Sequence, residues 1–286
     1  MPEPAAGIGA PATLSGRCAL VTGASRGIGR AIATRLAAHG AAVVLSSSPR
    51  SQDALQAARD DIRARGGRAE CLVAELGDDE ARRALVAQAA ELAGGIDVLV
   101  NNAAAIPAFE PASAMTLATR RRLFAINLDA PIDLVQQSLP AMRAKGWGRI
   151  LNISSDTVRQ PEVPYAGPAA MVHALSVYGA SKAALERVTT GLAAELHGSG
   201  VLVNALAPQR IARTERAERV AREVGRTRPE WVEPVETMAE AAYQLVAGTF
   251  TGLVTGSRDL MYRLQLPLHA LDGRTVIGDC MTPGVA

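Results

Sequence analysis

The hydrophobic positions of this chain fall into short continuous runs that alternate with longer segments of helical periodicity. A short apolar run bounded by glycine or polar residues is typical of a strand that is buried on both faces. Such strands are predicted at 17–22, 42–46, 68–74, 96–100, 148–153 and 201–206. Helices are predicted at 30–39, 53–64, 78–93 and 116–145, the last of them bent near Pro131 and Pro140. The alternation predicts an α/β fold, with a doubly wound parallel sheet and helices on both of its faces.

One domain over residues 16–275 accounts for this pattern. Residues 1–15 are rich in Pro, Ala and Gly and lack the basic start and apolar core of a secretory signal, so we expect a mobile tail there. A second tail is expected over 276–286. The region after the sixth strand has a weaker pattern. It predicts a charged, solvated helix within 214–228, a last strand within 251–256 and a helix over 258–264.

The composition excludes several classes of protein. The 286 residues carry a formal net charge of +2, so neither nucleic acid nor an anionic membrane is an expected partner. The apolar runs are shorter than the roughly 18 residues that cross a bilayer. The three cysteines, Cys18, Cys71 and Cys280, are far apart, which favours free thiols in a reducing compartment, and we expect a cytoplasmic protein. The spacing of Cys and His residues predicts no metal site.

A cluster of glycines lies between the first predicted strand and the first predicted helix. Gly23 permits a tight turn, Gly27 lets the backbone approach a pyrophosphate, and Gly29 lets the helix pack closely on the strand. The N-terminus of the helix adds N–H donors and the positive end of its dipole. A plain strand-to-helix turn is the alternative. The residues predicted to bind a dinucleotide here are Gly23, Ser25, Arg26, Gly27, Ile28 and Gly29.

The residues after the second strand indicate which dinucleotide binds. An NAD site usually places Asp or Glu there to hold the ribose 2′-hydroxyl, but this chain has Ser46 to Arg50 and no acid. Hydroxyl and guanidinium groups bind a 2′-phosphate, which a carboxylate would repel. Ser47 and Ser48, with Arg26 from the glycine turn, therefore favour NADP(H) over NAD(H). Arg50 is equally compatible with a solvated loop charge.

Tyr178 and Lys182 lie four residues apart in a predicted helix, about one turn from each other on the same face. A nearby ammonium group favours the phenolate, so we expect Lys182 to lower the pKa of Tyr178 towards neutral pH. A general acid or base for a carbonyl and alcohol pair needs such a group. The alternative is an ordinary amphipathic helix. Ser155, at the end of the fifth strand, could hydrogen-bond a substrate oxygen or be a loop serine, and Asn127 could serve a hydrogen-bonding role or lie on the surface.

Five motifs occur together in a fixed order: T-G-A-S-R-G-I-G at 22–29, N-N-A-A at 101–104, Asn127, N-I-S-S at 152–155 and Y-G-A-S-K at 178–182. From about Arg17 to Pro208 the chain resembles the short-chain dehydrogenase/reductase family, of the kind typified by 3-oxoacyl-acyl carrier protein reductase. The resemblance implies a single-domain Rossmann-type fold that binds a nicotinamide cofactor. It also implies a homotetramer or dimer, with helices near 116–137 and 177–196 at the dimer contact.

The resemblance further implies roles for individual residues. Tyr178 would be the proton donor and acceptor, and Lys182 would lower its pKa and hold the nicotinamide ribose. Ser155 would orient the carbonyl or hydroxyl group, and Asn127 would support a water relay to Lys182. The residues expected to contact the cofactor beyond the glycine turn are Ser47, Ser48, Glu75, Leu76, Asn101, Asn102 and Ala103.

The chain departs from the family pattern at several places. The interval between Ser155 and Tyr178 is about ten residues longer than usual, and it is expected to form an extended loop, 156–175, over the substrate mouth. Glu75 replaces the Asp that usually contacts adenine. Gln209 stands where a Gly is usual, and Thr214 comes one residue late, so the backbone contact to the nicotinamide amide is expected to differ.

Together these observations predict an NADP(H)-dependent oxidoreductase that interconverts a ketone or aldehyde and an alcohol, with a small carbonyl or alcohol compound as substrate. A non-catalytic NADP(H)-binding regulator or scaffold is the alternative, which the altered Glu75 and Gln209 favour and the Tyr–Lys pair disfavours. The side chains expected to form an apolar substrate wall, or else part of the core, are Phe109, Met115, Val163, Tyr165, Met171 and Leu175.

Overall fold

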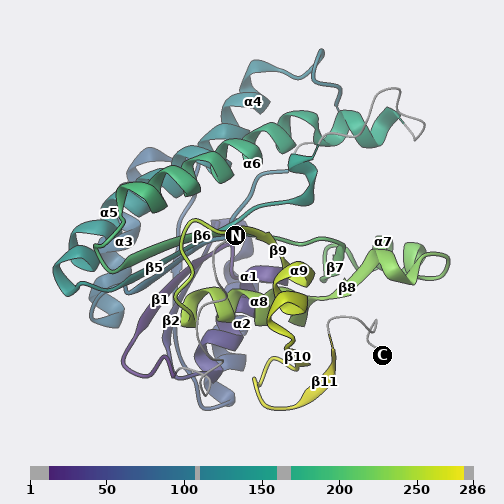
Figure 1. Ribbon diagram of the computed structural model, residues 1–286. Coiled ribbons are helices and arrows are strands. Elements are labelled where there is room, and N and C mark those ends of the chain that lie inside the picture. The colour runs from purple at the N-terminus through teal and green to yellow at the C-terminus, as the bar shows by residue number, and fades with distance from the viewer. Residues whose placement is uncertain (1–12, 107–109, 160–168, 280–286) are drawn as a thin grey trace.

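The computed structural model describes residues 13–106, 110–159 and 169–279, with the backbone alone at 169–175. Seven parallel strands form one twisted sheet in the order β3-β2-β1-β4-β5-β6-β9 (Figure 1). Their bounds are β1 Cys18–Thr22, β2 Ala42–Ser47, β3 Arg68–Val73, β4 Val98–Asn101, β5 Gly148–Ile153, β6 Val201–Ala207 and β9 Val254–Gly256. The order reverses between β1 and β4, which creates a crevice at the carboxyl ends of these strands. The predicted doubly wound sheet is confirmed.

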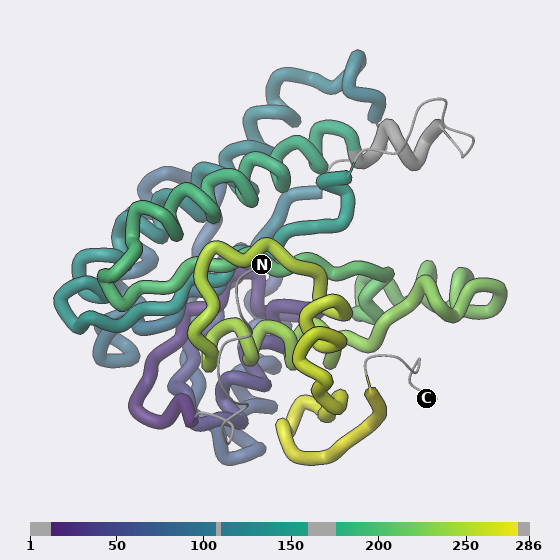
Figure 2. The backbone as a smooth tube through the Cα atoms, viewed as in Figure 1, coloured from purple at the N-terminus to yellow at the C-terminus, as the bar shows by residue number. Residues whose placement is uncertain are grey.

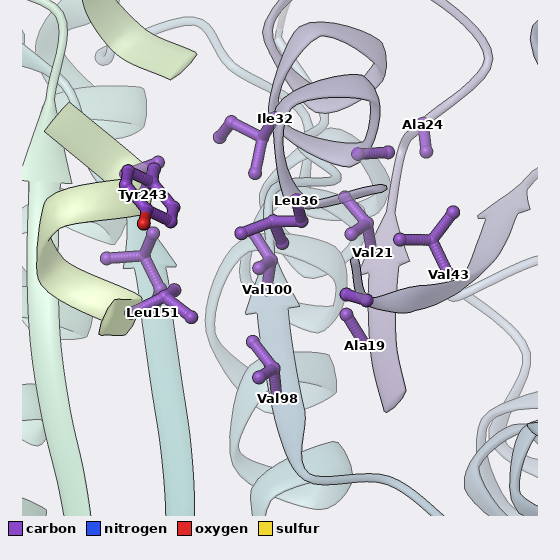
Figure 3. Close-up of a cluster of buried hydrophobic side chains, with 14 of the residues drawn as sticks. Ala19, Val21, Ala24, Ile32, Leu36, Val43, Val98, Val100, Leu151 and Tyr243 are labelled. Carbon is purple, nitrogen blue, oxygen red and sulfur yellow. The ribbon is translucent and has the colours of Figure 1, made fainter. Parts of the chain in front are cut away.

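Side chains of the strands alternate between two cores, one on each face of the sheet. Ala19 and Val21 of β1 pack with Ile32 and Leu36 of helix α1 (Figure 3), whereas the intervening Leu20 belongs to the other core. Helices α1 (Gly27–Ala38), α2 (Gln52–Ala64) and α8 (Val235–Ala247) cover the first face. Helices α3 (Asp79–Ala93), α5 (Ala130–Lys145) and α6 (Ala169–Glu195) cover the second. Burial on both faces explains why the strands are continuous apolar runs.

The helix predicted over 116–145 is divided into α4 (Leu117–Phe124), a π-helical turn (Ala125–Asp129) and α5. The interruption precedes Pro131, which lies in the first turn of α5, and Pro140 is accommodated inside that helix. The wide turn contains Asn127, whose side chain is fully buried and hydrogen-bonded to the loop after β4. Single π-helical turns are frequent at functional sites.

The long loop expected over 156–175 is shorter than predicted. A short 3₁₀ turn occupies Asp156–Val158, and α6 begins at Ala169. The expectation of a loop at 169–175 was therefore wrong, because the small and apolar residues there continue the helix that carries Tyr178. Residues 160–168 lie outside the described residues.

The region after β6 contains the predicted helices within 214–228 and over 258–264 and the predicted last strand, together with short strands that were not predicted. Strands β7 (Ile211–Arg213) and β8 (Val232–Pro234) form a small parallel pair, and the 3₁₀ turn Pro229–Trp231 precedes β8. Between them, α7 (Glu218–Gly225) projects from the body of the molecule (Figure 2). Beyond β9, helix α9 (Ser257–Leu264) leads to an antiparallel hairpin of β10 (Pro267–His269) and β11 (Val276–Asp279). Another 3₁₀ turn, Pro49–Ser51, precedes α2.

Residues 13–15 and 276–279, which were expected to belong to tails, are part of the folded structure. Leu14 is buried, and its backbone N–H donates to the oxygen of His39 at 2.8 Å. At the other end, β11 pairs with β10 where a tail was expected from 276. The expectations for 1–12 and 280–286 lie outside the described residues.

Arg35 of α1 fastens this C-terminal segment to the body of the protein. Its guanidinium is buried, forms an ion pair with Glu240 of α8, and donates 2.8 Å hydrogen bonds to the backbone oxygens of His269 and Ala270. His269 Nδ1 lies 3.1 Å from the same Glu240 carboxylate. The hairpin is therefore held by polar contacts as well as by Leu268 in the core.

Among the helices of the described residues, none combines the length and the apolar character that a membrane span requires.

Candidate active site

A cavity of about 860 Å³ lies at the carboxyl ends of the strands. It extends from the glycine turn after β1, past the serines after β2, to the N-terminal half of α6. Three of the four residues expected to be catalytic line this cavity: Ser155, Tyr178 and Lys182. The fourth, Asn127, does not. The predicted dinucleotide and catalytic motifs therefore meet in one crevice, although Gly23 and Lys182 are 159 positions apart in the chain.

The glycine turn is shaped by close backbone contacts. Gly23 and Gly27 have positive φ angles of 65° and 58°, which favour glycine. A Cβ at Gly29 would lie 2.3 Å from Asn102 Nδ2 and 2.5 Å from the oxygen of Gly23. Asn102 Nδ2 instead donates to Thr22 O at 2.8 Å and to Gly23 O at 3.1 Å. Gly29 thus serves packing beneath the turn, whereas Gly23, Ser25, Arg26, Gly27 and Ile28 line the cavity.

Hydroxyl and guanidinium groups converge at the end of β2. Ser47 and Ser48 line the cavity together with Arg26, Arg50 and Ser51. Arg26 donates to the Ser51 hydroxyl at 3.3 Å, a contact that sequence reasoning did not identify. Arg50, which the sequence left open, lies at this cavity as well. This donor set suits a phosphate monoester.

Glu75 and Leu76 lie at the same cavity, next to the serines. The Glu75 carboxylate is 3.6 Å from the guanidinium of Arg122 on α4 and accepts a 3.4 Å hydrogen bond from Gly77 N. Because Arg122 partly neutralises Glu75, the carboxylate is compatible with a cofactor-lining position. The sequence did not predict that Arg122 lines the cavity, because it lies in a run of arginines typical of an exposed helix face.

The two asparagines after β4 have different roles. Asn102 and Ala103 line the cavity, as expected, but Asn101 does not. The side chain of Asn101 is buried and donates to Asn152 Oδ1 at 2.9 Å, which joins β4 to β5. The expected contact between Asn101 and the cofactor is therefore replaced by a contact that holds two central strands together. Alternation of side chains along β4 turns Asn101 away from the cavity.

Tyr178 is 8% exposed, and its phenol faces Ser155. Burial raises the pKa of Tyr178 above its ordinary value, while the hydrogen bond with Ser155 and the positive charge of Arg216 act in the opposite direction. The expectation that Lys182 lowers this pKa is not met in this structure. The phenol is neutral near pH 7, the form that can donate a proton.

Lys182 is buried, and its ammonium donates to the backbone oxygen of Ile153 at 2.7 Å. Burial lowers the pKa of Lys182 to about 8. The ammonium thus hydrogen-bonds to the peptide oxygen at the end of β5 instead of the phenol of Tyr178. Lys182 nevertheless lines the cavity one helical turn from Tyr178.

Asn127 lies behind α6. Its Nδ2 donates to Ser181 Oγ and to Ala105 O, both at 3.0 Å, and its Oδ1 accepts from Ala105 N at 2.8 Å. Ser181 lies between Tyr178 and Lys182 in the sequence and donates to Tyr178 O at 2.7 Å. Asn127 therefore connects the π-helical turn, the loop after β4 and helix α6.

Gln209 and Thr214, where a changed backbone contact to the nicotinamide amide was expected, lie in different surroundings. The Gln209 side chain accepts from Asp259 N at 2.8 Å, in the first turn of α9, and does not line the cavity. Thr214 and Arg216 do line it. Arg216 was missed because its surroundings in sequence are those of a solvated helix. Its position two residues after Thr214 was the only sequence signal.

The one residue of the expected apolar wall whose side chain the structure describes belongs to the core, and other apolar side chains line the cavity. Met115 is buried in a small cluster with Leu123 and Tyr178 and does not line the cavity, so it is a core residue. Phe109, Val163 and Tyr165, and the side chains of Met171 and Leu175, lie outside the described residues. Ile106, Ile126 and Ile211 supply apolar surface in the described part of the cavity.

Residues 17–225 match the model of a family described as short chain dehydrogenase. Ketoacyl reductase HetN of Nostoc sp. is 38% identical over 202 residues, which cover 71% of this chain and 66% of that protein. Dehydrogenase/reductase SDR family member 4 of Bos taurus is 37% identical over 195 residues, 68% of this chain and 66% of its own length. The matched part is slightly less than two thirds of either relative.

Two solved structures with NADP bound are similar over most of the chain. A gluconate 5-dehydrogenase, described as putative, from Beutenbergia cavernae has 34% identity and a TM-score of 0.73, and the match covers 87% of this chain and 97% of that one. A 3-oxoacyl (acyl-carrier-protein) reductase from Agrobacterium tumefaciens has 32% identity and a TM-score of 0.73, with coverage of 85% and 93%.

Proposed function

Since the chain belongs to the short-chain dehydrogenase/reductase family, we propose that it is an NADP(H)-dependent oxidoreductase that interconverts a ketone or aldehyde and an alcohol. The observation that carries this proposal is the position of Ser155, Tyr178 and Lys182 at one end of a cavity whose other end is the glycine turn. The residues in the cavity thus provide both a dinucleotide cradle and a proton donor.

The cavity fits a dinucleotide with a 2′-phosphate. Its volume of about 860 Å³ lies within the usual range of about 300 to 1,000 Å³ for small-molecule and cofactor sites. The N-terminus of α1 would hold the pyrophosphate. Ser47, Ser48, Arg26 and Arg50 would hold the 2′-phosphate, since no acid follows β2. Lys182 would hold the nicotinamide ribose. A bound nicotinamide would supply or accept the hydride.

The residues of the chain would manage the proton. In the reductive direction the neutral phenol of Tyr178 donates its proton to the carbonyl oxygen, and Ser155 orients that oxygen by a hydrogen bond. In the oxidative direction the phenolate of Tyr178 accepts the proton of the alcohol. Asn127 acts through Ser181 and Ala105 to hold the catalytic helix at a fixed distance from the loop after β4. Asn127 would also support a water relay to Lys182.

A direct test compares the wild type with Tyr178→Phe. We expect the wild type to oxidise NADPH in the presence of members of a ketone and aldehyde panel, and Tyr178→Phe to lose activity by about 100-fold or more. Tyr178→Phe should still bind NADPH, measured by nicotinamide fluorescence. Binding of NADPH without turnover by either protein would instead support the non-catalytic regulator or scaffold.

The substrate is proposed only as a small carbonyl or alcohol compound. The similar structures carry names of different substrate classes, a sugar acid and an acyl-carrier-protein thioester, so they favour neither. We also propose a cytoplasmic homo-oligomer, a dimer or tetramer, that packs through the helical segments 116–137 and 177–196. Light scattering after size exclusion tests the assembly, and a monomer at all concentrations would contradict it.

A further inference from the structure

The turn that follows β7 has two charged residues at its tip. Ala217 N donates to Thr214 O at 2.9 Å and to Thr214 Oγ1 at 3.3 Å, which closes a tight turn over 214–217. Glu215 and Arg216 occupy the two central positions. The turn leads directly into α7, the helix that projects from the body of the molecule (Figure 1).

Glu215 reaches the glycine turn. Its Oε2 accepts a 2.8 Å hydrogen bond from Gly27 N, the N–H of the first residue of α1. Its Oε1 lies 3.6 Å from the guanidinium of Arg30, one turn further along the same helix. The side chain of Thr214 packs against Gly27: a Cβ added at Gly27 would lie 3.4 Å from Thr214 Cβ. Two neighbouring residues of the turn thus contact the start of α1.

The carboxylate of Glu215 occupies the N-terminus of α1, the position assigned above to the pyrophosphate of the proposed cofactor. The free N–H groups and the positive dipole end at the start of α1 stabilise an anion. In this structure the anion is supplied by the chain itself. A carboxylate and a pyrophosphate cannot both accept a hydrogen bond from the N–H of Gly27. Two anions side by side at the start of α1 would also repel each other.

We propose that Glu215 is an internal competitor for the cofactor pyrophosphate, and that cofactor binding displaces the 214–217 turn. The proposal rests on the proposed dinucleotide site and adds a conformational step to it. The protein binds cofactor only in the fraction of molecules whose turn has left α1, so Glu215 lowers the apparent affinity.

The displacement would also reach the substrate end of the cavity. Arg216 follows Glu215, lines the cavity, and acts electrostatically on the phenol of Tyr178. A turn that moves Glu215 away from Gly27 must also move Arg216 and the start of α7. Cofactor binding would therefore set the position of a cation beside the catalytic phenol before substrate enters.

The test is the affinity for NADPH, measured by nicotinamide fluorescence and by calorimetry, in the wild type and in Glu215→Gln. The substitution removes the charge but keeps the shape of the side chain. We expect Glu215→Gln to bind NADPH about five-fold more tightly. Glu218→Gln is the matched control, because Glu218 pairs with Arg222 on α7 at 3.1 Å and should leave the affinity unchanged.

A second ligand identifies the part of the cofactor that competes. Adenosine 2′-monophosphate contains the 2′-phosphate but no pyrophosphate, so its affinity should be the same in the wild type and in Glu215→Gln. Hydrogen exchange provides a readout without turnover: amides of 214–225 should exchange faster in Glu215→Gln than in the wild type, both without cofactor.

Equal NADPH affinity in the wild type and Glu215→Gln would overturn the inference, as would an equal gain for adenosine 2′-monophosphate. Glu215→Ala repeats the test with a variant that cannot accept the Gly27 N–H at all, and it should also bind NADPH more tightly. Failure of the wild type to bind NADPH would contradict the proposed function instead, so the two failures are distinguishable.

Discussion

The ammonium group of Lys182 donates a 2.7 Å hydrogen bond to the backbone oxygen of Ile153, in a position shielded from water. Burial lowers the pKa of Lys182 from an ordinary value of 10.5 to about 8. The unfolded chain therefore binds more protons than the folded protein between about pH 8 and 10.5, so this group makes stability rise with pH across that window. Below about pH 8 the ammonium is charged in both states, so the cost of burying it lowers the free energy of unfolding by its full value.

Lys182→Met should consequently stabilise the protein while it abolishes activity. We expect the free energy of unfolding in urea near pH 7 to rise by about 3 kcal/mol, the equivalent of the gap between the two pKa values. Near pH 10, where the folded wild type holds a neutral amine, the difference should be much smaller. A difference that is the same at both pH values would contradict the assignment of its cause to burial.

The cofactor preference can be tested at the end of β2. Arg26→Ala should weaken NADPH binding about ten-fold and leave NADH nearly unchanged, because a charge-assisted hydrogen bond to the 2′-phosphate is lost. Ser47→Asp should reverse the preference, because a carboxylate there repels the 2′-phosphate and accepts from the ribose hydroxyl. Thermal shifts with each cofactor provide the measurement.

Arg50→Ala, measured in the same assay, decides whether Arg50 is a ligand or a solvated charge. A wild type that is stabilised more by NADH than by NADPH would contradict the proposed preference.

Arg216 acts on the acidity of Tyr178. Its positive charge lowers the pKa of the phenol, so Arg216→Gln should shift the pH profile of alcohol oxidation upward, by about 0.5 pH unit at low ionic strength. The shift should decrease in high salt, because Arg216 is exposed. Arg219→Gln, a change of equal charge on α7, is the control. Equal shifts in both variants would show a general charge effect.

The ion pair of Arg35 and Glu240 can be tested by removing one partner or both. Glu240→Gln leaves the buried guanidinium without a counter-charge and should lower the free energy of unfolding by about 3 kcal/mol or more. Arg35→Met combined with Glu240→Met should recover much of the loss, since two apolar side chains replace two buried charges. Urea unfolding measures both variants, and a double variant as unstable as Glu240→Gln would contradict this explanation.

The sheet and the location of the site followed from the sequence because buried strands are apolar runs and the glycine motif lies between a strand and a helix. The parallel pair of β7 and β8 could not be predicted, since each strand has only three residues and so no readable apolar pattern. Asn101 and Asn102 are identical residue types in sequence, and only the pleat of β4 separates a strand contact from a cavity contact.

The electrostatics of the site were predicted less well than its residues. The spacing of Tyr178 and Lys182 indicates that they are neighbours, but it does not give the depth of burial, which raises the pKa of the phenol. It also does not show that the ammonium bonds to Ile153. Glu215 and Arg216 lie in a charged run, and their sequence gives no sign of their contacts because Gly27 is 188 positions from Glu215 in the chain.

The bond network of Arg35 has a practical consequence for engineering. It ties the hairpin to α1, and α1 begins at the glycine turn. Chimeras that exchange the C-terminal portion for that of a relative would leave this arginine buried without its acceptors. Such hybrids should lose cofactor affinity together with thermal resistance, even when the exchanged part never approaches the crevice. Expression tags are better placed at the other end of the polypeptide.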